Sequence, residues 1–325
     1  MDEPDIVKEL REEERLGKLK FRPMNIQMKI QKSDKSIYDP FDGIVDTTFQ
    51  WNSENYGLME LKSNVENLLG FNTFQYRDNY LTRRFNSRMR AYKIDNYFDY
   101  WTVLKDDERE QDKLVNALTI NVTEFFRDNP VYETFRTDVI PNILARKQGK
   151  IRVWSAGCSD GKEAYSIAMI FIDALGEQKA RDRVEIISTD IDKDCLHQAS
   201  SGLYISKPNI YQADIKQQLK FINNSERYFD ITNDIYSIKS CVKDIVKFQY
   251  HDLISSKKKE NFDVIFCRNV VIYFTKEFKN LLYENFHNAL NSEGYLIMGK
   301  TEILLGESRK LFKSFNPEER IFIKK

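Results

Sequence analysis

The stretch that decides the fold reads Ile151-Arg-Val-Trp-Ser-Ala-Gly157-Cys-Ser-Asp-Gly161-Lys-Glu163. Its first half is a short run rich in β-forming apolar residues, and its two glycines bracket a loop in which the backbone must turn sharply. Residues 164–175 continue with helical periodicity. The order of strand, glycine loop and helix predicts the βα turn of a nucleotide-binding α/β domain.

A second strand is predicted from Val184 to Thr189, and it ends in Asp190. A carboxylate at this position binds ribose hydroxyls in dinucleotide-binding sheets, although here it follows the loop by about 30 residues rather than about 20. The loop itself is G-x-x-x-G rather than G-x-G-x-x-G. A second interpretation is therefore open, in which the loop is a tight connection with Asp160 and Glu163 as a capping box.

Composition bounds the possible functions. The chain has 325 residues, of which 41% are hydrophobic, enough for one large or two modest domains. Basic and acidic residues balance at 50 each, so the net charge does not indicate a nucleic-acid partner. The sequence shows no secretory signal and no run near the ~20 apolar residues of a membrane span, so we expect a cytoplasmic protein without membrane insertion. The spacing of cysteines and histidines predicts reduced thiols and no metal.

The chain divides into an extension, a helical domain and an α/β domain. Residues 1–55 form an N-terminal extension for which the sequence indicates no function. Residues 56–128 carry apolar side chains at helical spacing and predict a small all-α domain. Its second helix, at residues 77–92, has an apolar side and basic outer faces that carry Arg83, Arg84, Arg88 and Arg90. Such a face is either solvated or docks on an acidic partner, and the number of arginines favours docking.

The α/β domain, residues 129–325, is interrupted at about residues 203–248, a stretch longer than an ordinary βα connection. Three β-rich segments lie at residues 228–231, 235–238 and 246–250. We expect them to form a small antiparallel β subdomain inserted into the α/β domain.

A fully buried strand is predicted from Phe262 to Cys267, and it leads directly into Arg268 and Asn269. Parallel sheets bind their ligands at the carboxyl ends of the strands, so this pair is expected at the site. The predicted fold class is therefore α/β and Rossmann-like, with an inserted antiparallel subdomain and a preceding all-α domain.

Three separated motifs carry a family resemblance. They are Leu118-Thr-Ile-Asn-Val-Thr-Glu-Phe-Phe-Arg127-Asp128, the glycine loop above, and Phe262-Asp-Val-Ile-Phe-Cys-Arg268-Asn-Val-Val-Ile-Tyr273-Phe274. Supporting segments are Leu81–Met89, Ser188–Asp192 and Met298–Glu302. Over residues 56–325 the chain resembles the chemotaxis receptor methyltransferase family.

The resemblance implies an S-adenosylmethionine-dependent protein-glutamate O-methyltransferase with a Rossmann-like methyltransferase domain. Such an enzyme forms glutamyl methyl esters on the cytoplasmic helices of chemoreceptors and releases S-adenosylhomocysteine. By position, the family assigns catalytic roles to Arg127 and Tyr273. It assigns cofactor contacts to Asn121, Thr123, Arg127, Gly157, Glu163, Asp190, Asp252, Leu253, Arg268 and Asn269. The basic helix and the β subdomain correspond to receptor-docking surfaces, the latter for a receptor tail, and we expect a monomer that binds no nucleic acid.

The chain departs from the family pattern at four positions. Asp160 and Lys162 replace a small hydroxyl residue and an acid, Lys300 replaces a common histidine, and Asp252 a frequent asparagine. The departures leave the other carboxylates and the Arg268-Asn269 pair in place, so catalysis is expected. A glutamate side chain, with a reference pKa of about 4.3, is already an anionic nucleophile at neutral pH and needs no general base. The alternatives are a methyltransferase for another substrate class, such as RNA, and a non-catalytic cofactor-binding signalling module.

Overall fold

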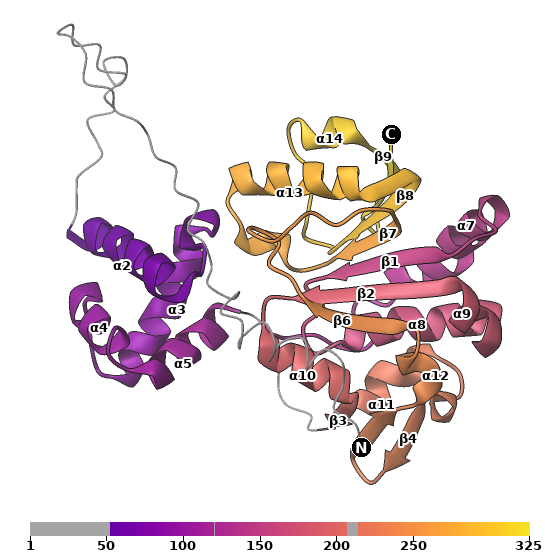
Figure 1. The fold of residues 1–325 in the computed structure, drawn as a ribbon, viewed down its shortest axis with the longest axis horizontal. Helices are drawn as coiled ribbons and strands as arrows, with labels where there is room; N and C mark the ends of the chain where they lie inside the picture. Colours follow the sequence, from indigo (N-terminus) through magenta and orange to yellow (C-terminus); the bar gives the residue numbers. More distant parts are fainter. Residues whose placement is uncertain (1–52, 120, 207–213) are drawn as a thin grey trace, which may run out of the picture. The chain divides into compact units, whose positions relative to one another are not determined.

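The computed structural model describes residues 53–119, 121–206 and 214–325 (Figure 1). Most of the predicted N-terminal extension, residues 1–52, lies outside them. The described chain separates into two compact units, with the division between Leu118 and Thr119. Each unit is described by itself.

The first unit is helical. Its elements are α2 (Ser53–Leu69), the short 3-10 helix η1 (Thr73–Gln75), α3 (Asp78–Ala91), α4 (Tyr97–Leu104) and α5 (Glu108–Leu118). Helix α3 buries Leu81, Phe85 and Met89, which recur every four residues and so share one face of the helix. The predicted all-α domain, with its amphipathic second helix, is thus confirmed.

A buried ion pair joins α3 to α5. The guanidinium of Arg88 donates to both carboxylate oxygens of Glu110, at 2.9 and 2.5 Å, and the hydroxyl of Tyr100 donates to the same carboxylate at 2.8 Å. The side chain of Glu110 is completely buried. A charge in such a place is tolerated only when it is paired and hydrogen-bonded. The contact therefore fixes how the two helices pack.

The second unit is an α/β domain. Its helices are α6 (Pro130–Thr134), a π-helical turn η2 (Phe135–Val139), α7 (Ile140–Arg146), α8 (Lys162–Leu175), α9 (Glu177–Arg183), α10 (Lys193–Ser201), α11 (Ile215–Gln218), α12 (Ser240–Lys243), α13 (Lys276–Ala289) and α14 (Ser308–Leu311), with short 3-10 turns η3 (Leu219–Phe221), η4 (Ser225–Arg227) and η5 (Val271–Tyr273). Its strands are β1 (Ile151–Ala156), β2 (Val184–Asp190), β3 (Leu203–Ile205), β4 (Phe229–Thr232), β5 (Ile235–Ile238), β6 (Val246–Tyr250), β7 (Phe262–Cys267), β8 (Leu290–Met298), β9 (Phe312–Asn316) and β10 (Ile321–Lys324).

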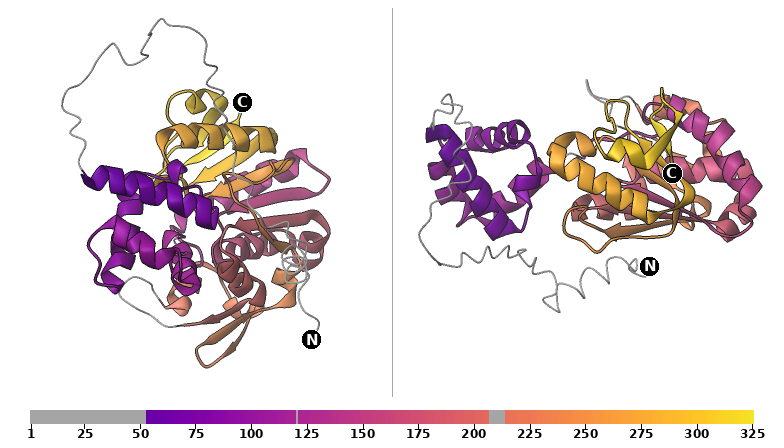
Figure 2. Two further views of the ribbon diagram at one scale, coloured as in Figure 1. Left: turned by 60° about the vertical axis from the view of Figure 1, so that its left-hand side comes forward. Right: turned by 90° about the horizontal axis from the view of Figure 1, so that it is seen from above.

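Seven strands form one sheet in the order β6-β2-β1-β7-β8-β10-β9. The five strands from β6 to β8 are parallel, and β10 and β9 close the far edge as antiparallel strands. Helices cover both faces of the sheet (Figures 1 and 2). The chain first runs outward from β1 to β2 and β6, then returns to the other side of β1 with β7. The predicted α/β fold is confirmed.

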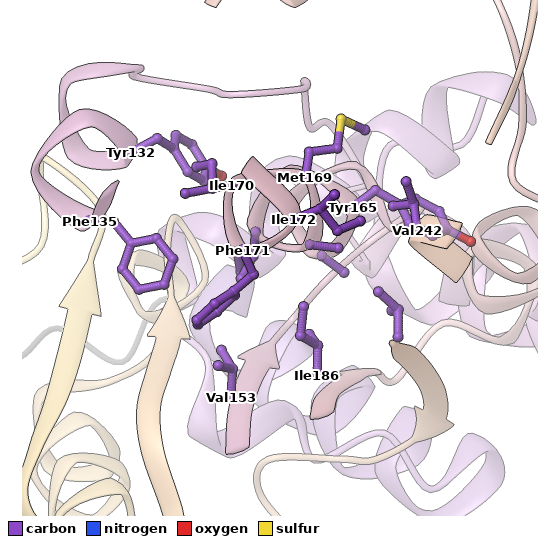
Figure 3. Close-up of a cluster of buried hydrophobic side chains, with 14 of the residues drawn as sticks. Tyr132, Phe135, Val153, Tyr165, Met169, Ile170, Phe171, Ile172, Ile186 and Val242 are labelled. Atoms are coloured by element: carbon purple, nitrogen blue, oxygen red, sulfur yellow. The ribbon is translucent and has the colours of Figure 1, made fainter. Parts of the chain in front are cut away.

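The core lies between the sheet and α8. Ile167, Ile170 and Phe171 of α8 are fully buried, because the helix packs on the strands and is itself covered by η2 and α12. Figure 3 shows Phe171 pointing toward Val153 of β1, with Ile186 of β2 beside it. A helix covered on several sides is apolar nearly all round, as this one is.

The inserted β subdomain is a three-stranded antiparallel sheet in the order β3-β5-β4, with a turn at Asn233 and Asp234. One assignment was wrong: residues 246–250 form β6, which pairs in parallel with β2 of the main sheet. Parallel neighbours need a long crossover connection between them. Helix α10 and the subdomain together are that connection, so the insertion ends before β6.

We expect Glu110→Gln to destabilise the helical unit by about 2 to 4 kcal/mol, since it leaves the guanidinium of Arg88 without a buried anion. Although burial alone would raise the pKa of Glu110, hydrogen bonds from Arg88 and Tyr100 leave it lowered. The stabilisation is therefore present above the unfolded pKa and lost as the pH falls through the folded value. Hydrogen exchange of amides in α3 and α5 measures the effect.

The matched control for this variant is Glu108→Gln, because Glu108 is exposed at the start of the same helix. Equal protection factors in the two variants would contradict the role given to the buried pair.

Candidate functional site

The candidate site lies at the carboxyl ends of β1 and β7, where the chain passes from one side of β1 to the other. Strands β1 and β7 are parallel neighbours but far apart in the sequence, and their carboxyl ends carry the glycine loop and the Arg268-Asn269 pair. Helices that leave such neighbouring strands toward opposite faces open a crevice at this edge. A pocket is found there, lined by Val122, Thr123, Arg127, Tyr132, Gly157, Ser159, Glu163, Arg268, Asn269, Val270 and Tyr273.

The glycine loop is held tightly from the neighbouring strand. The amides of Gly157 and Cys158 both donate to the carbonyl of Thr189, at 2.8 and 2.9 Å. Gly157 has φ +79°, and a Cβ atom on it would stand 2.4 Å from a methyl carbon of Val270. Glycine is therefore required both by the backbone conformation and by the close approach of the loop after β7.

Helix α8 begins directly after this loop without a side-chain cap. Its N-cap residue is Gly161, with φ +87°. Glu163 turns back to accept a hydrogen bond from the hydroxyl of Ser155, at 2.8 Å. The capping box between Asp160 and Glu163 is thus not formed, and the carboxylate of Glu163 faces the pocket.

Asp190 anchors the loop as well as ending β2. Its two carboxylate oxygens accept from the amides of Ser159, at 2.7 Å, and Asp192, at 3.0 Å. Burial raises the pKa of Asp190 to about 6. A carboxylate has about four lone-pair positions, so these hydrogen bonds leave acceptor capacity on Asp190 unused. Asp190 is not among the residues that line the pocket described above.

Arg268 forms the charged floor of the pocket. Its buried guanidinium donates to Asp128, at 2.9 Å, and lies 3.8 Å from Glu163. It also lies over the ring of Tyr132, 5.3 Å from the ring centre. Burial raises the pKa of Glu163, and the opposing effects of Arg268 and Ser155 do not cancel this rise.

The segment from Asn121 to Asp128 forms the opposite wall. Thr123 and Arg127 line the pocket, and the guanidinium of Arg127 donates to the carbonyl of Val122 at 3.1 Å. Asn121 instead donates to Asp192 at 2.7 Å, which fixes the start of the segment to the N-terminus of α10. It is not one of the pocket-lining residues.

Two further predicted cofactor contacts, Asp252 and Leu253, do not line this pocket either. The carboxylate of Asp252 is buried and accepts from the amide of Ile254 and the hydroxyl of Ser255, at 2.9 and 2.5 Å. It organises the turn that follows β6. Their roles as cofactor contacts stay predictions.

Sequence reasoning missed several residues of the site. Ser159 and Tyr132 line the pocket, and Asp128 pairs with Arg268. Glu302 is 3% exposed and accepts from the amides of Gly299, Asn269 and Val271, so it holds the loop that carries Asn269. Two of these residues could have been predicted from the sequence. Ser159 lies between the two loop glycines, and Glu302 is the last residue of one of the quoted motifs.

On α3, the four arginines predicted to dock on a receptor differ in exposure and pairing. Arg88 is committed to Glu110, as described above. Arg84 is partly buried, with its guanidinium 5.4 Å from the ring centre of Tyr80. Arg83 and Arg90 are exposed. The basic face that is open to a partner therefore centres on these two residues.

The residues present fit an adenosyl cofactor. Within the described part of the chain, the hydroxyl of Ser159 and the Nε of Arg268 are buried without a hydrogen-bond partner. Buried donors of this kind at a pocket wall are groups that a polar ligand satisfies. Among residues 53–119, 121–206 and 214–325, no cluster of three histidine, cysteine or acidic side chains is arranged to hold a metal ion. No helix within the same ranges could cross a membrane.

A parallel sheet with a glycine loop and a polar pocket at its reversal point defines an α/β protein that binds a nucleoside-containing cofactor. The chain belongs to the CheR methyltransferase family: residues 121–321 match its S-adenosylmethionine-binding domain, and residues 57–119 match its all-alpha domain. S-adenosylmethionine is therefore the cofactor, and the protein is a methyltransferase of chemotaxis.

Curated relatives agree with the family match. A chemotaxis protein methyltransferase of Listeria innocua is 32% identical over 243 residues, covering 74% of this chain and 87% of the relative. One of Borreliella burgdorferi is 28% identical over 250 residues, covering 74% and 86%. A chemotaxis protein methyltransferase of Vibrio cholerae is 29% identical over 232 residues, covering 69% and 77%.

We expect Asp190→Asn to weaken binding of S-adenosylhomocysteine at least tenfold, since a hydrogen bond to a charged acceptor contributes about 1.5 to 3 kcal/mol. In the wild type the affinity should fall as the pH drops through about 6, where Asp190 becomes protonated. The part of the pH dependence that comes from Asp190 should vanish in the variant. Calorimetry between about pH 5 and pH 8 measures both effects.

Asp194→Asn is the control for charge removal, because Asp194 is an exposed acid on the following helix. Wild-type affinity in Asp190→Asn would contradict the predicted ribose-binding role of Asp190.

Proposed function

We propose that the protein methylates glutamate side chains of chemoreceptors and leaves glutamyl methyl esters. The observation that carries the proposal is the chemistry of the pocket. None of the described residues that line it is a histidine, cysteine or lysine, while Arg127 and Arg268 supply forked donors that suit carboxylates. A substrate that is already anionic at neutral pH, such as glutamate, needs positioning rather than deprotonation.

Six of the lining residues then have a definite task. When bound, S-adenosylmethionine would supply an electrophilic methyl group to a carboxylate oxygen of the substrate, and S-adenosylhomocysteine would leave. Arg127 and Tyr273 orient the substrate carboxylate. Glu163, beside Arg268, holds the methionine portion, and Thr123 and Asn269 contribute polar contacts on either side. Correct alignment of reacting groups can supply about 7 to 11 kcal/mol of the barrier reduction.

Arg268 is the less suitable of the two arginines for holding the substrate. Its side chain is 2% exposed and already paired with Asp128 and Glu163. Arg127 is partly exposed, and its guanidinium donates a hydrogen bond to a neutral backbone carbonyl, that of Val122. Arg127 therefore has the freedom to meet an incoming carboxylate, whereas Arg268 keeps the floor of the pocket in place.

The surfaces that would meet the receptor lie outside the pocket. On the helical unit, Arg83 and Arg90 suit an acidic helix surface. On the β subdomain, Leu203, Ile205 and Ile235 are 48%, 57% and 45% exposed, and Ile205 stands directly opposite Ile235 on the neighbouring strand. An apolar sheet face of this kind suits a receptor segment such as its tail.

The ester is tested with labelled cofactor and a cytoplasmic receptor fragment. The transferred label should be released as volatile methanol under mild alkali, because esters hydrolyse where N-methyl and ether groups do not. The rate should fall as the pH approaches about 4.3 and the substrate carboxylate becomes protonated. The Arg127→Ala variant should have a much lower turnover, while its binding of receptor should change little. Alkali-stable label, or label on RNA and none on receptor, would contradict the proposal.

The docking face is tested by charge reversal. We expect Arg83→Glu with Arg90→Glu to raise the Michaelis constant for receptor about tenfold, with unchanged affinity for cofactor, since rim charges act mainly on association. Arg109→Glu with Lys113→Glu is the matched control, because both residues are exposed on α5 of the same unit. Steady-state kinetics at physiological ionic strength, where screening reaches about 8 Å, decides. Equal constants in the two double variants would show that the arginine face is only solvated.

A further inference from the structure

A tyrosine of the β subdomain reaches the glycine loop. Tyr204 lies in the middle of β3 and is 3% exposed. Its hydroxyl donates to the backbone carbonyl of Asp160 at 2.6 Å. Asp160 follows Ser159 in the loop, and the amide of Ser159 is bound by Asp190. The loop backbone is thus held from one side by the main sheet and from the other by the inserted subdomain.

The unusual charge pair of the loop lies against the same ring. Asp160 forms an ion pair with Lys162, and their side chains are only 18% and 12% exposed. The ammonium of Lys162 lies 4.9 Å from the centre of the Tyr204 ring, close enough for a cation–π contact. Burial of both charges makes each one dependent on the other. Lys162 therefore interacts with both the carboxylate of Asp160 and the ring of Tyr204.

Tyr204 also contacts the opposite wall of the pocket. Its ring meets the ring of Phe125 edge to face, with 5.1 Å between the centres. Phe125 stands between Thr123 and Arg127, which line the pocket, and its amide donates at 2.8 Å to Gln218 of α11 within the insertion. The inserted segment therefore holds both the loop and the wall that face the cofactor.

From these contacts we infer that Tyr204 is a positioning residue for cofactor binding, which sets the glycine loop and the Phe125 wall at the separation that the cofactor requires. The inference rests on the placement of the cofactor in the pocket proposed above. It gives the β subdomain a task inside the enzyme, in addition to any contact with a partner. It also accounts for the presence of both Asp160 and Lys162 in the loop, since the two charges neutralise each other locally.

The test compares two buried tyrosines of the insertion. Tyr204→Phe removes only the hydroxyl that holds the loop. Tyr228→Phe is the matched control, because the hydroxyl of fully buried Tyr228 donates to Asp173 on α8, away from the pocket-lining residues. Both variants should lower the thermal midpoint to a similar extent. Tyr204→Phe alone should weaken S-adenosylhomocysteine binding about fivefold, which corresponds to about 1 kcal/mol for one net hydrogen bond.

The charge pair offers a second, independent test. Lys162→Met leaves Asp160 buried without its cation and should weaken cofactor binding several-fold. The double variant with Asp160→Asn should recover most of the loss, because no unpaired charge then remains. In kinetics, these changes should raise the Michaelis constant for the cofactor with kcat nearly unchanged.

Equal cofactor affinities in Tyr204→Phe and Tyr228→Phe, or no recovery in the double variant, would overturn the positioning role. The measurements use the full chain and S-adenosylhomocysteine alone. They are therefore independent of the receptor: if receptor glutamates are not methylated, the proposed substrate fails while the calorimetric comparison still decides the role of Tyr204.

Discussion

The buried guanidinium of Arg268 is the contact on which the rest of the site depends. Arg268 directly follows β7, and its guanidinium pairs with Asp128 at 2.9 Å and faces Glu163 at the start of α8. Three segments far apart in the sequence thus converge on one charge. A buried charge of this kind is strongly destabilising if a partner is removed, so the ends of the segments cannot separate independently. The pocket wall after Asn121 is positioned by this contact as much as by its own backbone.

The order of the strands explains why the site lies at the carboxyl ends of β1 and β7. Strand β1 is the point at which the chain turns from one side of the sheet to the other, so its loop and that of β7 meet at the same edge. The close approach requires Gly157, because any side chain there would strike Val270. Binding of S-adenosylmethionine, which the family match establishes, is thus consistent with the geometry of the reversal point.

The β subdomain serves both the topology of the main sheet and the geometry of the pocket. As the crossover between β2 and β6 it satisfies the topology of parallel pairing, and through Tyr204 and Gln218 it contacts the loop and the wall of the pocket. The exchange of charges at Asp160 and Lys162 is absorbed there by a local ion pair. The two charges of the loop are therefore paired with each other rather than left unpaired beside the pocket.

The sequence by itself determined the elements and the family, because strand, loop and helix at residues 151–175 are encoded by neighbouring residues and the quoted motifs are contiguous. It placed Gly157, Glu163 and Arg268 at the correct edge for the same reason. Only the tertiary structure decided that Arg88 pairs with Glu110 and that residues 246–250 join the main sheet. Those outcomes depend on contacts between residues distant in the sequence, where a basic side chain or a short β-rich segment has several partners of equal local merit, and burial in the folded chain selects among them.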